Sequence, residues 1–229
     1  MSGFVDRENE IFDVLRRFRA EALDFVVVGG YGVSAYQHRF SVDADLVVQP
    51  DDVPTFGRIL EARGFEKDTD REVGVYGGRY LAYVKNTELP VTIDLLVGAL
   101  QCRQTDASWS YRYIREHAVT REIEGSEESV QVRVPTEDLL IAFKLHSGRL
   151  TDTRDVIALM EHADLDDVAT HIDRGDRAAL GRVLSKVDQM VSAPNFEDSF
   201  KGVFSRGSLP EHEIAQLRDF LDERTEDAD

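Results

Sequence analysis

Apolar residues recur at two different spacings in the first 134 residues. Between residues 5 and 22 they stand three and four positions apart, which predicts an amphipathic helix. Shorter helices are expected over 31–38 and from a turn at 50–52 to about residue 63, whereas 103–118 shows no clear pattern. Short β-branched or alternating runs predict strands at 25–28, 42–48, 73–76, 80–84, 91–97, 119–124 and 129–134.

The pattern changes at Pro135. Thr136 is a candidate helix N-cap with acidic residues in the following turn, and the rest of the chain has helical spacing. The sequence therefore predicts an α+β protein, with a mixed β-sheet flanked by helices in residues 1–134 and a helical C-terminal domain in residues 135–229. The expected helices of that second domain are 136–147, 152–163, 165–173, 176–192 and 210–224.

The net charge of the chain limits the classes of binding partner that we expect. The 229 residues hold 27 basic and 44 acidic side chains, a net charge of −17, and only five of the basic residues are lysine. Such a surface disfavours simple polycationic binding to nucleic acid. It is what we expect of a halophilic protein, because a salt-rich cytoplasm screens the self-repulsion of so many carboxylates.

The cysteine content and the length of the apolar stretches indicate the cellular compartment in which we expect the protein. The single cysteine, Cys102, excludes an intrachain disulfide and a cysteine-based zinc site within one chain. The longest uncharged stretch, 25–37, is too short to span a bilayer, and the N-terminus is acidic instead of basic. We therefore expect a protein of the reducing cytoplasm with no membrane partner.

The predicted strand at 42–48 carries two carboxylates, Asp43 and Asp45, on the face opposite its apolar residues. Side chains at i and i+2 lie about 6–7 Å apart and repel one another unless a cation lies between them. With a third acid from a neighbouring strand they would suit one or two Mg²⁺ ions, and Asp94, the one charge in the run 91–97, is the candidate. Taken alone, two aspartates on a solvated strand face would be the simpler interpretation.

The preceding residues favour the metal site. Gly29 and Gly30 follow the strand at 25–28 and precede a short helix, where backbone without side chains can approach phosphate oxygens closely. A basic residue, Arg39, and the hydroxyl of Ser41 then lead into the Asp-x-Asp strand. This order indicates a site that brings a triphosphate and Mg²⁺ together.

These motifs resemble the nucleotidyltransferase superfamily, in which a hydrophobic strand ending in Gly-Gly or Gly-Ser is followed by a short helix and Asp-x-Asp. Residues 39–46 are most similar to its AbiEii and MenT toxin-like branch and to related prokaryotic members, and Ala44 departs from the larger aliphatic residue often found between the aspartates. The match covers most of residues 24–160. Past Pro135 it includes Glu137, Asp138, Leu139, Leu140, Lys144, Leu145, Arg149, Asp152 and Asp155.

The resemblance implies the catalytic residues. Asp43 and Asp45 would bind Mg²⁺, two ions in all, with Asp94 as the third ligand and as the acid that helps activate the attacking hydroxyl. Lys144 would reach the phosphates as a mobile point charge, with a surface lysine as the alternative. Asp155 would orient Lys144 or Arg149.

The resemblance also implies a binding site for a nucleoside triphosphate. Gly29 and Gly30 would line the path of the triphosphate, and Lys144 would contact its phosphates. Arg39 would clamp a phosphate or would merely pair with an acid in this acidic chain, and Ser41 would supply a hydroxyl to the ligand.

The acceptor is open at this stage. Similarity to toxin-like members implies a tRNA or protein acceptor and a cognate antitoxin, but an acidic chain needs a local basic patch or high salt to bind RNA. Four arginines near aromatic residues supply either such a patch or, as we favour, salt bridges under aromatic core residues. They are Arg103, Arg112, Arg115 and Arg121, beside Trp109, Tyr111 and Tyr113.

The sequence therefore predicts a Mg²⁺-dependent enzyme that moves a nucleoside monophosphate from an NTP to a hydroxyl and releases pyrophosphate. The helical domain over 135–229 would complete the active-site cleft. The alternative, from another functional class, is a catalytically silent nucleotide- or partner-binding module of the same fold.

The charge balance generates a first prediction. If the acidic surface is an adaptation to salt, screening stabilises the folded chain, and the thermal midpoint of unfolding rises between dilute buffer and molar KCl. Circular dichroism scans at fixed pH measure this midpoint. A chain that is no less stable in dilute buffer than in molar KCl would contradict the interpretation.

Overall fold

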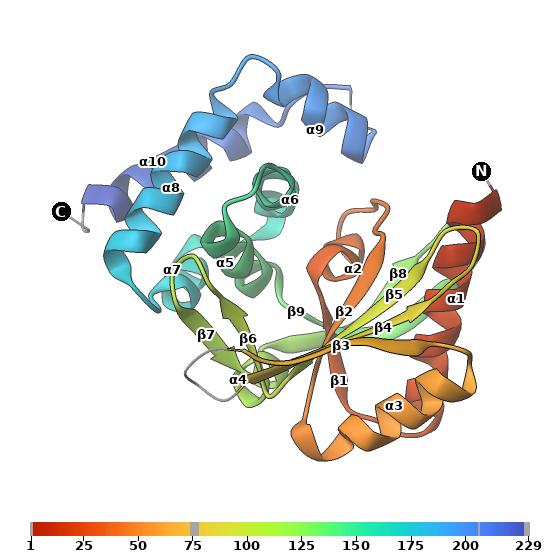
Figure 1. Cartoon of the computed structure of the whole chain (residues 1–229). Coiled ribbons are helices and arrows are strands. Elements are labelled where there is room, and N and C mark those ends of the chain that lie inside the picture. The colour runs from red at the N-terminus through yellow and green to blue at the C-terminus, as the bar shows by residue number, and fades with distance from the viewer. Residues whose placement is uncertain (1, 74–77, 206, 227–229) are drawn as a thin grey trace. The chain divides into compact units, whose positions relative to one another are not determined.

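The computed structural model describes residues 2–73, 78–205 and 207–226 (Figure 1). The chain divides into two compact units, of which the first comprises residues 1–101 and 109–135 and the second residues 102–108 and 136–229. The class is α+β, as the sequence predicts. The predicted domains, 1–134 and 135–229, did not include the return of 102–108 to the second unit.

The first unit combines one large sheet with helices and a hairpin. The elements β6 and β7 lie where the chain leaves this unit and returns to it. In chain order the elements are α1 (Ser2–Ala20), β1 (Phe25–Val28), α2 (Gly29–Ser34), β2 (Asp43–Val48), a 3₁₀ turn (Pro50–Asp52), α3 (Val53–Ala62), β3 (Glu66–Val73), β4 (Gly78–Lys85), β5 (Val91–Val97), β6 (Ala99–Cys102), β7 (Ala107–Ser110), α4 (Tyr111–Glu116), β8 (Ala118–Glu124) and β9 (Ser129–Pro135).

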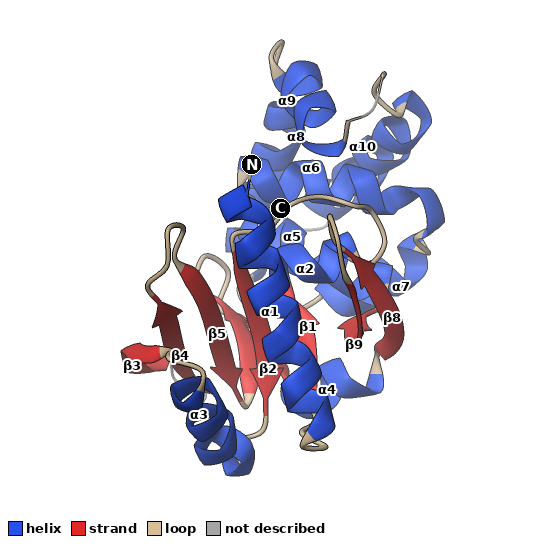
Figure 2. Cartoon of the chain, turned by 90° about the vertical axis from the view of Figure 1, so that its right-hand side faces the viewer, coloured by secondary structure: helices blue, strands red, loops and turns tan. Residues whose placement is uncertain are grey.

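The large sheet has the strand order β1-β2-β5-β4-β3 (Figure 2). The β2–β5 pair is parallel, and the other three pairs are antiparallel. Separate two-stranded sheets are formed by β6 with β7 and by β8 with β9. The parallel pair at the centre of the sheet is the feature that positions the candidate site.

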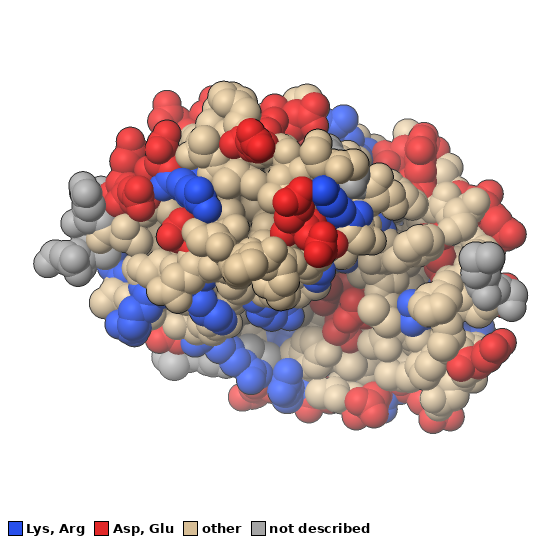
Figure 3. All heavy atoms as spheres, turned by 90° about the horizontal axis from the view of Figure 1, so that it is seen from above, with Lys and Arg blue, Asp and Glu red and all other residues tan. Residues whose placement is uncertain are grey.

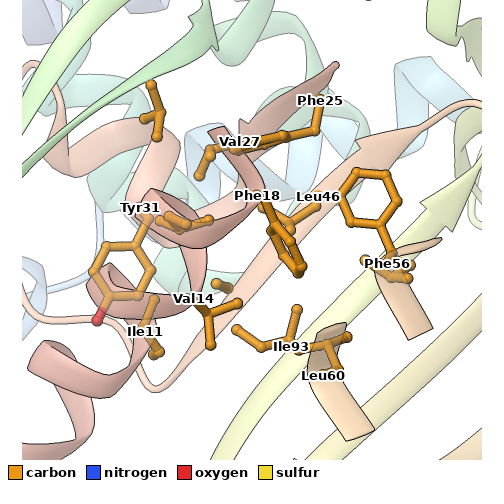
Figure 4. Packing of buried hydrophobic residues seen from close by; sticks show 14 of the residues in the cluster. Ile11, Val14, Phe18, Phe25, Val27, Tyr31, Leu46, Phe56, Leu60 and Ile93 are labelled. Atoms are coloured by element: carbon orange, nitrogen blue, oxygen red, sulfur yellow. The ribbon is translucent and has the colours of Figure 1, made fainter. Parts of the chain in front are cut away.

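The main core of this unit lies on one face of the large sheet, where α1 crosses the strands (Figure 2). Phe18 of α1 packs edge to face against Phe56 of α3, with ring centroids 4.7 Å apart, and against Phe25 of β1 (Figure 4). Ala44 and Ile93 come from the central strands and are fully buried in the same cluster. Removing this apolar surface from water holds the helices against the sheet.

Several predicted boundaries differ from the structure. Val42, expected on the apolar face of its strand, is 61% exposed, because the strand begins one residue later. The helix predicted over 31–38 is α2, Gly29–Ser34, and Gly29 adopts a positive φ of 61°, which glycine tolerates, where the chain turns from β1 into this helix. The unassigned segment 103–118 forms β7 and α4. The strand predicted at 73–76 lies outside the described residues except for its first residue, which ends β3, and β3 pairs with β4.

The second unit is helical, with α5 at its centre. Its first helix contacts α6, α7 and α8, and buries every residue from 139 to 146. The sequence analysis did not predict α9, because its few apolar residues lie in a short stretch between two turn signals. The elements are α5 (Glu137–Ser147), α6 (Leu150–Leu159), a 3₁₀ turn (Met160–His162), α7 (Leu165–Ile172), α8 (Arg177–Val191), α9 (Phe196–Phe204) and α10 (Glu211–Glu226).

A fully buried histidine, His146, ties three segments of the second unit together. Its Nε2 lies 2.8 Å from the carbonyl oxygen of Ile172, so Nε2 carries the proton. Its Nδ1 lies 2.7 Å from the Thr105 hydroxyl and accepts from it. Burial in this neutral, satisfied state lowers the pKa of His146 from 6.5 to about 4.

Two surface features complete the description. Acidic side chains are spread widely over the face shown in Figure 3, in keeping with the net charge of the chain. Within the described ranges, every helix is either too short or too polar to cross a membrane.

His146 makes the stability of the chain depend on pH. As the pH falls below about 6.5 the unfolded chain takes up the proton first, so stability is complete above pH 6.5 and falls by about 3 kcal/mol as the pH approaches 4. Urea unfolding between pH 4.5 and 7.5 measures this loss. His146→Gln should flatten the profile, whereas His162→Gln, an exchange of an exposed histidine in the same unit, should leave it unchanged.

If the free energy of unfolding changed with pH equally in wild type and in His146→Gln, the pH dependence would have to come from other titratable groups.

Candidate functional site

The parallel pairing of β2 with β5 brings the three predicted acids to one face of the sheet. Asp45 lies directly opposite Asp94, and Asp43 lies two residues before Asp45 on the same side of β2. The alternate residues, Ala44 and Ile93, point into the core on the other face. A single strand pair thus separates an apolar face from a face that carries three carboxylates.

Asp94 is held from β4 by a tyrosine. The Tyr80 hydroxyl donates to Asp94 Oδ2 over 2.8 Å, and the Arg71 guanidinium lies 4.8 Å from the centroid of the Tyr80 ring. Burial raises the pKa of Asp94 to about 6, and the charge of Asp43 adds to this rise against the opposing effects of Tyr80 and Arg71. The pKa of Tyr80 is raised as well, by burial and by its bond to Asp94.

The chemistry of this donor set suits a divalent cation in part. Three carboxylates on one face are the ligand type that Mg²⁺ prefers, and Asp94 Oδ1 is buried with no hydrogen-bond partner among the described residues. However, no three acidic, histidine or cysteine side chains of the described chain converge closely enough to hold a metal ion. The residues fit Mg²⁺ by type and by face, and a metal ion here stays a prediction.

The diglycine packs directly against these acids. Gly29 has a φ of 61°, and a Cβ at this position would overlap the carboxylate of Asp45. A Cβ on Gly30 would overlap the Ser41 hydroxyl and would come within 2.9 Å of Arg39 Nη2. Both glycines are therefore required by close approach, and they bring five of the predicted site residues into contact.

The loop between α2 and β2 is held by its own hydrogen bonds. The Ser34 hydroxyl lies 2.6 Å from the Arg39 carbonyl oxygen, and the Ser41 hydroxyl donates to the Asp43 carbonyl oxygen over 3.2 Å. Arg39 Nη1 donates to the Phe40 carbonyl oxygen, while the Phe40 side chain is exposed. These contacts fix the entry to the Asp-x-Asp strand.

The predicted residues of the second unit form a buried ion cluster. Lys144 Nζ lies 2.9 Å from Asp152 Oδ1 and 2.9 Å from Asp155 Oδ2. Asp152 also accepts from the Ser147 hydroxyl over 2.7 Å and from Arg149 Nε over 2.6 Å. Lys144 is only 7% exposed, so it is neither a surface lysine nor a mobile charge, because two carboxylates hold it in place.

Electrostatics bind this cluster together. Burial alone would lower the pKa of Lys144, but Asp155 and Asp152 outweigh that effect and raise it. Burial would conversely raise the pKa of Asp152, yet Lys144 and Arg149 hold it below its usual value. Each charge is matched by an opposite one, which is the condition under which buried ions are tolerated.

Sequence reasoning missed the role of Tyr80 and the depth of Asp152. The available signal for Tyr80 was the alternation of β4, which places it on the same face as Ala82, the partner of Asp94. Of the arginines beside the aromatic residues, Arg112 pairs with Glu116 and Arg115 with Asp24. Trp109 and Tyr111 are buried, and the Arg121 guanidinium lies 4.9 Å from the centroid of the Tyr36 ring, so two of the four arginines form the salt bridges that the sequence favoured.

Comparison with known proteins identifies the fold. No protein-family model matches the sequence, and no curated protein is significantly similar to it. Among solved structures, one described as a "putative nucleotidyltransferase from H. pylori" aligns over 100% of this chain and 97% of its own, with a TM-score of 0.50 and 14% identity. Its likeness shows that this chain has the nucleotidyltransferase fold.

Two further solved structures align over part of the chain. The lincosamide antibiotic adenylyltransferase LnuA, with lincomycin bound, covers 68% of this chain and 98% of its own at a TM-score of 0.46 and 18% identity. The antibiotic-resistance factor ANT(2'')-Ia covers 71% and 86% at a TM-score of 0.49 and 14% identity.

The packing at Gly29 generates a stability prediction. Gly29→Ala introduces a side chain at positive φ and against Asp45, so we expect it to lower the free energy of unfolding by about 1–3 kcal/mol. The matched control is Gly202→Ala in α9, where the new methyl group meets nothing within 4 Å and should add up to about 1 kcal/mol. Urea denaturation measures both. Equal effects of the two exchanges would mean that Gly29 is not packed as described.

Proposed function

We propose that this chain is a Mg²⁺-dependent nucleotidyltransferase that moves a nucleoside monophosphate from an NTP to a hydroxyl acceptor. The observation that carries the proposal is the register of β2 and β5, with Asp45 opposite Asp94 and Asp43 on the same face. Two adjacent glycines packed against Asp45 and Ser41 support it, as does the nucleotidyltransferase fold.

The reaction needs a base at the acceptor hydroxyl. Its oxygen attacks the α-phosphorus, the bond from that phosphorus to the bridging oxygen breaks, and pyrophosphate leaves with the electron pair. In the proposal, the hydroxyl proton passes to Asp94. The geometry that supports this role is the buried Oδ1 of Asp94, which has no hydrogen-bond partner among the described residues and so can accept a proton.

Asp43, Asp45 and Asp94 would hold the metal. Mg²⁺ supplies neutralisation of the charge on the phosphates and a template for the displacement. Among this chain's own residues, Tyr80 keeps Asp94 Oδ2 oriented, so that the carboxylate has one fixed and one available oxygen. Arg39 and Ser41, next to Gly30, are proposed to contact the phosphates of the NTP.

Lys144 and Asp155 enter the proposal in a changed role. Because Lys144 Nζ is shared between Asp155 and Asp152, contact with a phosphate would require it to leave at least one of them. We therefore propose that the cluster positions the exposed Arg149, whose Nε donates to Asp152, as a basic group that the second unit presents to solvent.

The acceptor is proposed to be a hydroxyl of a tRNA or a protein, as in a toxin with a cognate antitoxin. The support is the sequence resemblance alone. The competing proposal, a silent binding module, is favoured by the lack of a converged metal site among the described residues. An activity measurement separates the two.

The decisive experiment is transfer of label from each of the four α-labelled nucleoside triphosphates. Wild type is incubated with Mg²⁺, molar KCl and a cell extract, and RNA and protein are analysed separately for label. Asp43→Asn/Asp45→Asn should abolish transfer without unfolding the chain, since both side chains are only partly buried and asparagine has nearly the same shape as aspartate. The control Asp51→Asn/Asp52→Asn, in the turn after the same strand, should retain it.

Label on RNA or on protein, only with wild type and the control, would establish the reaction and the acceptor class. Absence of label from all four nucleotides, with a folded wild type at several salt concentrations, would overturn the proposal in favour of the binding module.

A further inference from the structure

An arginine-lined pocket lies in the first unit, away from the carboxylates. Its volume is about 340 Å³, within the range of small-ligand sites, and Phe25 and Val132 supply apolar wall. Its charged groups are Arg19 at the end of α1, Asp24 before β1, Arg115 on α4 and Arg133 on β9. None of these residues belongs to the site proposed for the transfer reaction.

The carboxylate of Asp24 accepts hydrogen bonds from two of the arginines at once. Its carboxylate accepts from Arg115 Nε at 3.0 and 3.2 Å, and from Arg133 Nη1. A guanidinium has five N–H donors, so most donors of both arginines find no partner among the described residues. Asp24 therefore orients two guanidinium groups and leaves donors over for a ligand.

Arg19 adds a third guanidinium. It is exposed, and in the described part of the chain its side chain has no hydrogen bond or ion pair. The end of α1 that carries it closes through Ala22, a non-glycine residue at a φ of 56°, with Leu23 N–H donating to the Phe18 carbonyl oxygen. This turn brings Arg19, Ala22 and Asp24 to one pocket wall.

The charge of the pocket points to a dianion. Three guanidinium groups against one carboxylate leave two positive charges, in a chain whose net charge is −17. A phosphate monoester carries about −1.5 to −2 at pH 7 and has three acceptor oxygens, and arginine forks match such oxygens in geometry. A carboxylate ligand would leave one charge unmatched.

The pocket is distinct from the carboxylate site in position. It borders Phe25, at the first residue of β1, whereas Gly29 and Asp45 lie at the other end of that strand, about 10 Å along it. The pairing of Phe25 with Val48 and of Val28 with Asp45 sets this separation.

We propose that this pocket binds a phosphate monoester, with Arg19, Arg115 and Arg133 as the binding residues and Asp24 as their positioning residue. The ester is either a small free molecule or the terminal phosphate of a nucleic acid strand, since both present the same group. The proposal is independent of the transfer reaction.

Calorimetric titration tests it without Mg²⁺, at the lowest KCl concentration at which the wild type is folded. The probes are ribose 5-phosphate, and a short single-stranded RNA with and without a 5′-phosphate. Arg19→Gln should weaken binding about tenfold or more, because it removes charge-assisted hydrogen bonds from a side chain that holds nothing else. Arg17→Gln is the matched control, since Arg17 lies in the same helical turn and pairs with Glu21.

Arginine Nε–Hε NMR signals locate the bound ligand, and those of Arg115 and Arg133 should shift on titration. Binding of ribose 5-phosphate identifies a small free ester, and binding of phosphorylated RNA alone identifies a strand end. Equal binding of phosphorylated and unphosphorylated RNA with no binding of the sugar phosphate, no binding of any probe, or equal losses in Arg19→Gln and Arg17→Gln would each overturn the proposal.

Discussion

The parallel register of β2 on β5 is the constraint on which the candidate site depends. A shift by one residue would move Asp94 into the apolar face and Ile93 out of it, so burial of Ile93, Leu95 and Ala44 specifies where the acids stand. Like charges directly opposite one another on a sheet are destabilising, and Asp43 adds to the raised pKa of Asp94. The core therefore enforces an arrangement that the three carboxylates by themselves would avoid.

Buried charged side chains are fully paired in the second unit but only partly hydrogen-bonded in the first. Lys144 in the second unit is matched by Asp152 and Asp155, and Asp152 is further satisfied by Ser147 and Arg149. Asp94 in the first unit has one hydrogen bond, from Tyr80, and an oxygen left over within the described structure. A completed network rigidifies its surroundings, whereas an incomplete one retains capacity for a ligand or a proton. This contrast is why we assign the chemistry to the acids of the first unit and a positioning role to the cluster of the second.

Net charge describes this chain poorly at the scale of a binding site. The excess of carboxylates is global, but Asp24 gathers Arg115 and Arg133 beside Arg19 into a local basic pocket. Arginine suits that arrangement because its fork serves one carboxylate and still presents donors to another anion. An acidic protein can in this way recognise an anion without a basic surface.

The sequence by itself determined the local features: the periodicities that separate an α+β part from a helical part, the diglycine after β1, and the Asp-x-Asp on one strand face. These are fixed by spacing along the chain, because side chains of a strand alternate and glycine alone tolerates such close approach. Only the tertiary structure decided the non-local ones. The Tyr80 contact with Asp94, the burial of Lys144 between two aspartates, and the meeting of Arg19, Arg115 and Arg133 join residues distant in sequence, and strand register and helix packing, which set those distances, depend on the whole core.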